Sequence, residues 1–136
     1  MADPEDPPVT WANQTYGLDK RLVKACKKAG WVSPTLVQQS AIPMILSGRD
    51  VLCRARTGAG KTAAYLLPVL QKILQRKTGE GGGEPGVRAL ILVPTNELCQ
   101  QVARQLDELV YYCADVVSVL SLASTSDAGG GGGQKK

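Results

Sequence analysis

The chain has 136 residues, of which 43% are hydrophobic and 21% charged, as in one globular domain, and its net charge of +4 is compatible with a polyanionic partner. It contains no histidine and no CxxC pair, so zinc sites of the usual kind and histidine-based catalytic triads are excluded. The N-terminus is acidic and no apolar run reaches the roughly 18 residues of a membrane span, so we expect an intracellular protein with no membrane partner.

The first third of the chain is predicted to contain a leader and two helices. Residues 1–12 are rich in proline and acidic side chains and are predicted to be disordered. Apolar residues recur at helical spacing over 18–29 and again over 35–47, and a glycine follows each of these stretches as a stop signal.

Three strands and two further helices are predicted to alternate in the remainder. Short apolar runs of strand length occupy 50–55, 87–93 and 116–123, whereas 61–77 and 97–113 carry apolar residues at helical spacing. A strand–helix–strand–helix–strand order is typical of an α/β fold in which helices flank a parallel sheet with right-handed crossovers.

Glycine-rich segments separate or follow these elements. The loop 78–86 and the tail 124–136 hold runs of glycine and are predicted to lack order. The folded domain is therefore predicted to span 13–123. Because three strands make a thin sheet for such a fold, we expect it to be part of a larger domain.

The stretch RARTGAGKT, residues 54–62, lies between the first predicted strand and the helix after it. Glycines let such a loop turn so that its amides, with those of the helix N-terminus, point at an anion. Lys61 is placed to bridge the β- and γ-phosphates of a nucleotide, and the Thr62 hydroxyl to ligate Mg²⁺. We therefore predict a nucleotide site rather than a chance glycine turn. Its predicted contacts are Ala55, Arg56, Thr57, Gly58, Ala59, Gly60, Lys61 and Thr62, of which Lys61 and Thr62 are also the catalytic candidates.

The loop has the form AxTGxGKT, with Ala55 where the general P-loop pattern has its first glycine. This form resembles the corresponding motif of the DEAD-box helicases of superfamily 2, in which a serine is usual at the position of Ala59. The resemblance implies a RecA-like P-loop domain, ATP and Mg²⁺ as cofactors, and ATP-dependent action on RNA.

A second stretch, GWVSPTLVQQSAIP at 30–43, resembles the adenine-reading Q motif of the same family. A glutamine side chain can pair with both the acceptor N7 and the donor N6 of adenine. By resemblance Gln38 is that reader, Trp31 packs beneath the segment and Thr35 belongs to the site. The alternative is a helix N-terminus whose glutamine is merely solvated.

One feature of the family pattern is displaced. The family normally has an aromatic residue 17 positions before the glycine of the Q motif, and that position is Asn13 here. With a shifted register, the resemblance leaves Trp11 or Tyr16 as the side chain that stacks on the base.

The stretch PTNELCQQ at 94–101 follows the second predicted strand and resembles motif Ia, usually PTRELAxQ. By analogy, the side chains that contact the backbone of single-stranded RNA, independently of its sequence, are Pro94, Thr95, Asn96 and Glu97. Asn96 stands where the family has a basic residue, so we expect a weaker grip. The alternative is a helix cap without RNA, with Thr95 as the N-cap and Glu97 in the first turn.

The resemblance covers about residues 17–121, and the motifs follow in the order of the family. No DEAD tetrapeptide occurs, and no acidic residue after Thr62 directly follows a predicted strand. Such a carboxylate is needed to hold Mg²⁺ and orient the attacking water. We therefore expect a fragment truncated before the DEAD motif, without the C-terminal RecA-like domain and inactive in hydrolysis alone.

The sequences of these motifs most resemble those of the nucleolar DEAD-box helicases of large-subunit ribosome assembly. That resemblance implies a nuclear, nucleolar location and pre-ribosomal particles as partners. Two alternatives remain open. One is a non-catalytic nucleotide- or RNA-binding module, and the other is an unrelated P-loop NTPase, which leaves PTLVQ and PTNEL unexplained.

Overall fold

The computed structural model describes residues 8–14, 16–78 and 84–123, and these residues contain four helices. All four lie where the sequence predicts helices, with ends shifted by a few residues. The tail, most of the glycine loop and most of the leader lie outside the described residues. The helices are α1 (Lys20–Lys28), α2 (Leu36–Leu46), α3 (Lys61–Thr78) and α4 (Asn96–Val110).

Side-chain caps fix where three of the helices begin. The carboxylate of Asp19 accepts the Arg21 amide at the start of α1 at 2.9 Å. Thr35 caps α2 and Thr95 caps α4, each accepting the amide three residues ahead. These caps satisfy amides that have no partner within the helix, so the helix starts can be read from local sequence.

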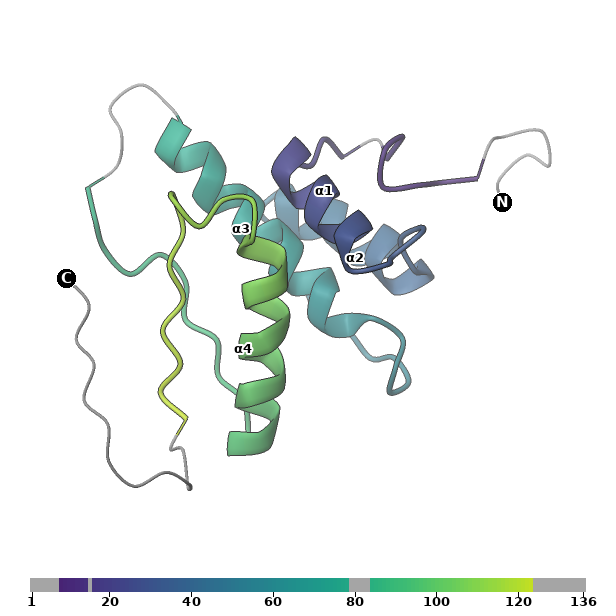
Figure 1. Ribbon diagram of the computed structural model, residues 1–136. Coiled ribbons are helices and arrows are strands. Elements are labelled where there is room, and N and C mark those ends of the chain that lie inside the picture. The colour runs from purple at the N-terminus through teal and green to yellow at the C-terminus, as the bar shows by residue number, and fades with distance from the viewer. Residues whose placement is uncertain (1–7, 15, 79–83, 124–136) are drawn as a thin grey trace.

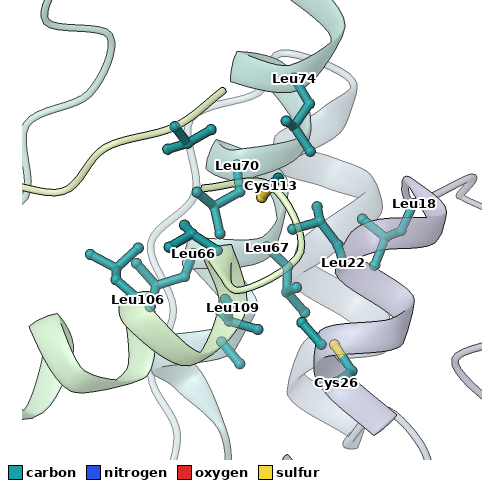
Figure 2. Close-up of a cluster of buried hydrophobic side chains, with 14 of the residues drawn as sticks. Leu18, Leu22, Cys26, Leu66, Leu67, Leu70, Leu74, Leu106, Leu109 and Cys113 are labelled. Carbon is teal, nitrogen blue, oxygen red and sulfur yellow. The ribbon is translucent and has the colours of Figure 1, made fainter. Parts of the chain in front are cut away.

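α3 is the central helix, and Figure 1 shows α1 and α2 on one side of it and α4 beside it. Its leucines meet those of α1 and α4 in the core drawn in Figure 2, where Leu22, Leu67 and Leu109 are fully buried. Pro68 is also buried, yet α3 continues through it to Thr78. The proline therefore does not end the helix, although it removes one backbone hydrogen bond.

The three predicted strands are not formed as strands in the part of the chain described by the structure. The segments 50–55, 87–93 and 116–123 are irregular, so the parallel sheet expected from the sequence is absent from these residues. A strand needs the backbone groups of a neighbouring strand, and apolar content alone does not provide them. In Figure 1 the last two segments run as extended chain beside α4.

The side chains of two of these segments nevertheless alternate with the period of a strand. Ile91 and Val93 pack against the core, whereas Leu90 and Leu92, which alternate with them along the chain, are 75% and 83% exposed. The segment 116–123 repeats the pattern, with Val117 buried and Leu120 and Leu122 exposed. One face of each segment is thus packed on the helices and the other is open.

Candidate functional site

The glycine loop turns into α3 through two left-handed residues. Gly58 and Gly60 have φ angles of 81° and 87°, a region that favours glycine. The Ala64 amide then donates to the Gly60 carbonyl at 3.1 Å, which closes the first turn of α3. The loop therefore delivers its backbone to the positive end of the 18-residue helix.

The loop is joined directly to the segment that begins α2. The Gln38 side chain donates through Nε2 to the Gly60 carbonyl at 3.1 Å, and the Thr35 hydroxyl donates to the Ala59 carbonyl at 2.9 Å. Gln38 Oε1 also accepts the Thr35 amide at 2.9 Å, so the two residues form a capping box. Two stretches more than 20 residues apart in the chain thus form one hydrogen-bonded unit.

Gly60 is required by space as well as by its φ angle. A Cβ atom at this position would lie 2.5 Å from Gln38 Nε2 and 3.1 Å from the Thr35 hydroxyl. Around Gly58, in contrast, nothing lies within 4 Å of such an atom. The close approach of the Q segment, defined as residues 30–43, is therefore specific to Gly60.

Lys61 folds back on the loop. Its ammonium donates to the carbonyls of Ala55 and Arg56, the latter at 2.9 Å. In this arrangement the charge of Lys61 lies at the mouth of the loop and is held by neutral acceptors. An anionic group would compete with them successfully, because hydrogen bonds between ionised partners are stronger than those with a neutral carbonyl.

Thr62 faces α4 across a polar hollow of about 370 Å³. α4 contributes Arg104 and Glu108 to the same hollow. The sequence did not single out these two residues, since nothing in their local pattern distinguishes them from solvated positions on a helix. Burial raises the pKa of nearby Tyr65, and a hydrogen bond with Thr62 opposes that rise.

The loop fits a nucleotide phosphate chain. Left-handed glycines, a helix N-terminus and a displaceable lysine are the features that bind phosphate. Thr62 supplies a hydroxyl suited to Mg²⁺, a cation that keeps several waters and takes few protein ligands. Among the residues that the structure describes, no group of three or more Cys, Asp and Glu side chains could hold a metal on its own.

The aromatic candidates for base stacking lie in or against the core. Trp11 is 1% exposed, and its ring centroid lies 6.3 Å from that of half-buried Trp31. Tyr16 packs against the same core with its hydroxyl buried, and burial raises its pKa to about 12. Trp11 thus has no exposed face for a base, and it extends the core into the stretch where the sequence predicts a leader.

Residues 94–97 are exposed and lead into α4. The Thr95 hydroxyl accepts the Leu98 amide at 3.2 Å, and Glu97 lies in the first turn. The helix cap expected as the alternative is therefore present. A helix N-terminus whose residues are exposed also suits a phosphate, so the cap and an RNA contact are compatible.

No helix among the described residues is long and apolar enough to cross a membrane.

Comparison with known proteins identifies the family to which the chain is similar. Residues 35–129 match the family model described as DEAD/DEAH box helicase. The chain is 51% identical over 113 residues to the ATP-dependent RNA helicase dbp-9 of Neurospora crassa, covering 82% of this chain and 16% of that protein. It is 47% identical over 113 residues to the ATP-dependent RNA helicase DBP9 of Candida glabrata, covering 82% and 19%.

Two solved structures share the fold. One is a DEAD box protein from the hyperthermophile Methanococcus jannaschii, with a TM-score of 0.62 and 29% sequence identity. The match covers 75% of this chain and 26% of that protein's chain. The RNA-helicase Prp28 from Chaetomium thermophilum bound to ADP matches 73% and 24%, with a TM-score of 0.60 and 38% identity. These neighbours are RecA-like, as the sequence predicts, and the chain spans less than a fifth of the curated relatives above. The chain belongs to the DEAD/DEAH box helicase family.

Proposed function

We propose that this chain binds ATP with Mg²⁺, and single-stranded RNA, as the N-terminal part of an ATP-dependent RNA helicase. The observation that carries the proposal is the hydrogen-bonded unit formed by Thr35, Gln38, Ala59 and Gly60. It brings the segment expected to read adenine against the loop expected to hold phosphate. The relatives are named ATP-dependent RNA helicases, which agrees with this assignment.

Different groups of the loop would hold the phosphates and the metal. The loop amides from Thr57 to Gly60 and the N-terminus of α3 would hold the phosphates, and Lys61 would leave its carbonyl partners to neutralise them. Thr62 would ligate Mg²⁺, which supplies charge neutralisation at the phosphates when bound.

Gln38 retains the capacity to read adenine. An amide oxygen accepts two hydrogen bonds and an amide nitrogen donates two. In this structure Oε1 accepts the Thr35 amide and Nε2 donates to the Gly60 carbonyl, so the capacity for one acceptor and one donor bond remains. Adenine needs one of each, to its N6 and N7. By this count Gln38 could hold the loop and select adenine at once. Because the residue is only 5% exposed, its amide would have to become accessible to the base.

The RNA backbone would be contacted at the start of α4 by Pro94, Thr95, Asn96 and Glu97.

The domain is proposed to span 13–123. Within it, parallel strands would form from the segments 50–55, 87–93 and 116–123. The alternation of packed and exposed side chains in the last two segments has the period of a strand, which supports strand formation there. The resemblance of the motifs to those of nucleolar DEAD-box helicases is the basis for proposing a nucleolar role in ribosome biogenesis, with pre-ribosomal particles and a C-terminal RecA-like domain as partners.

We further propose that the chain, by itself, binds ATP but does not hydrolyse it. The sequence contains no DEAD tetrapeptide, and phosphoryl transfer to water needs a carboxylate that holds the metal and a group that orients the water. In this respect the chain would act as a non-catalytic binding module. Steady release of phosphate at a rate that Lys61→Ala abolishes would contradict this part of the proposal.

The test of ATP binding uses a fluorescent ATP analogue with Mg²⁺ and the variants Lys61→Ala and Lys72→Ala. Lys72 is an exposed lysine on α3, the same helix that Lys61 begins, and serves as the matched control. We expect Lys61→Ala to weaken binding by about tenfold or more, equivalent to about 1.4 kcal/mol, and Lys72→Ala to leave it unchanged. Equal binding by all three proteins would refute the site.

A further inference from the structure

A basic face with two exposed tyrosines lies on α1 and at the C-terminal end of α4. Four lysines of α1 recur at positions i, i+4, i+7 and i+8, which places them on one side of the helix, and all four are exposed. The two tyrosines directly follow α4 and are 58% and 39% exposed. We call the set the lysine–tyrosine face: Lys20, Lys24, Lys27, Lys28, Tyr111 and Tyr112.

The two parts of this face are in contact. The Lys28 ammonium lies 3.9 Å from the centroid of the Tyr111 ring, and the rings of Tyr111 and Tyr112 meet edge to face at 5.0 Å. An ammonium above a ring is held by the ring's negative face, so the pair is preorganised. Charge and aromatic surface are thus presented together.

Helix stability explains only two of the four lysines. Lys27 and Lys28 lie in the last turn of α1, where the helix dipole favours a cation. Lys20 begins the helix, where a cation is disfavoured, and Lys24 repels both Lys20 and Lys28 four residues away. The carboxylate of Asp19, next to Lys20 in the chain, pairs with Arg21 at 2.9 Å.

We propose that the lysine–tyrosine face binds single-stranded RNA, at a place separate from residues 94–97. Cations that follow a phosphate backbone, combined with aromatic rings on which bases stack, are how proteins bind single strands without sequence preference. α4 has 15 residues, so its two ends are about 20 Å apart, and the face at its C-terminal end is not part of the contact at its N-terminal end. An acidic protein segment would use the lysines but would have no need of exposed rings.

The test measures binding of fluorescein-labelled oligouridine by anisotropy, without nucleotide and over a range of salt concentrations. The variant Lys24→Gln/Lys28→Gln is compared with Lys72→Gln/Arg76→Gln, an exposed pair on α3 with the same spacing and the same change in charge. We expect the first pair to lower the slope of log affinity against log salt by about 1.4, because each neutralised phosphate of a single strand contributes about 0.7. The control pair is expected to leave affinity and slope unchanged.

Tyr111 separates RNA from an acidic polypeptide. Tyr111→Ala is expected to weaken oligouridine binding by about fivefold or more through lost stacking, whereas Tyr111→Phe retains it. Equal effects of the two charge pairs would overturn the proposal, as would absence of binding. Competition by polyglutamate as strong as that by RNA, with Tyr111→Ala neutral, would assign the face to an acidic protein instead.

Discussion

Gly60 lies where the P-loop meets the Q segment, and its substitution combines two separable effects. Gly60→Ala would place a Cβ atom 2.5 Å from Gln38 Nε2, so the Gln38 amide would have to move and lose its bond to the Gly60 carbonyl. The left-handed backbone adds a cost of about 1–2 kcal/mol for a residue other than glycine. We expect a loss of stability in urea unfolding and a loss of ATP binding.

Gly58→Ala is the matched control for that substitution. Gly58 has a similar φ angle of 81°, but nothing lies within 4 Å of a Cβ atom there. It should show the backbone cost alone, and the difference between the two variants measures the contact with Gln38. If Gly58→Ala and Gly60→Ala were equally destabilised, the contact between the loop and the Q segment would make no contribution to the free energy of unfolding.

At the level of elements, the threonines that cap α2 and α4 differ in the number of hydrogen bonds that their hydroxyl groups make. The Thr95 hydroxyl accepts the cap bond from the Leu98 amide, whereas the Thr35 hydroxyl both accepts a cap bond and donates to the Ala59 carbonyl. We expect Thr95→Ala to cost about 1 kcal/mol of unfolding free energy and Thr35→Ala about 1 kcal/mol more. Chemical denaturation of both variants checks this, with Thr35→Ser retaining most of the stability. A larger loss for Thr95→Ala would argue against the role assigned to Thr35.

Elements fixed by local chemistry could be predicted, and those fixed by distant partners could not. Apolar spacing, with a glycine stop signal after the first two helices, placed all four helices within a few residues. Strand pairing at 87–93 depends on a neighbouring strand, so an apolar run alone did not determine it. In the site, glycines and Lys-Thr predicted the loop, but the fold-back of Lys61 and the approach of Arg104 depend on three-dimensional packing.

At the scale of the whole molecule, the two extended segments present several exposed leucines. Leu90, Leu92, Leu120 and Leu122 are each at least 75% exposed, and such surfaces promote association. We expect the double substitution Leu90→Lys/Leu122→Lys to reduce binding of a hydrophobic dye and to raise solubility, with the circular dichroism spectrum unchanged.

The control for that prediction changes the inward face of the same segment. Ile91 packs against the core, so Ile91→Lys should bury a charge and lower stability substantially. Unfolding by Leu90→Lys/Leu122→Lys to the same degree as by Ile91→Lys would show that both faces are packed in solution.

The central claim is that the Q segment and the P-loop form one site that selects ATP. Calorimetric titration of ATP and of GTP into the wild-type chain and Gln38→Ala, with folding followed by circular dichroism, tests it most directly. We expect the wild type to prefer ATP, and Gln38→Ala to lose about tenfold more affinity for ATP than for GTP. An equal loss for both nucleotides would reduce Gln38 to a support for the loop at Gly60, and unchanged binding of both would contradict the account altogether.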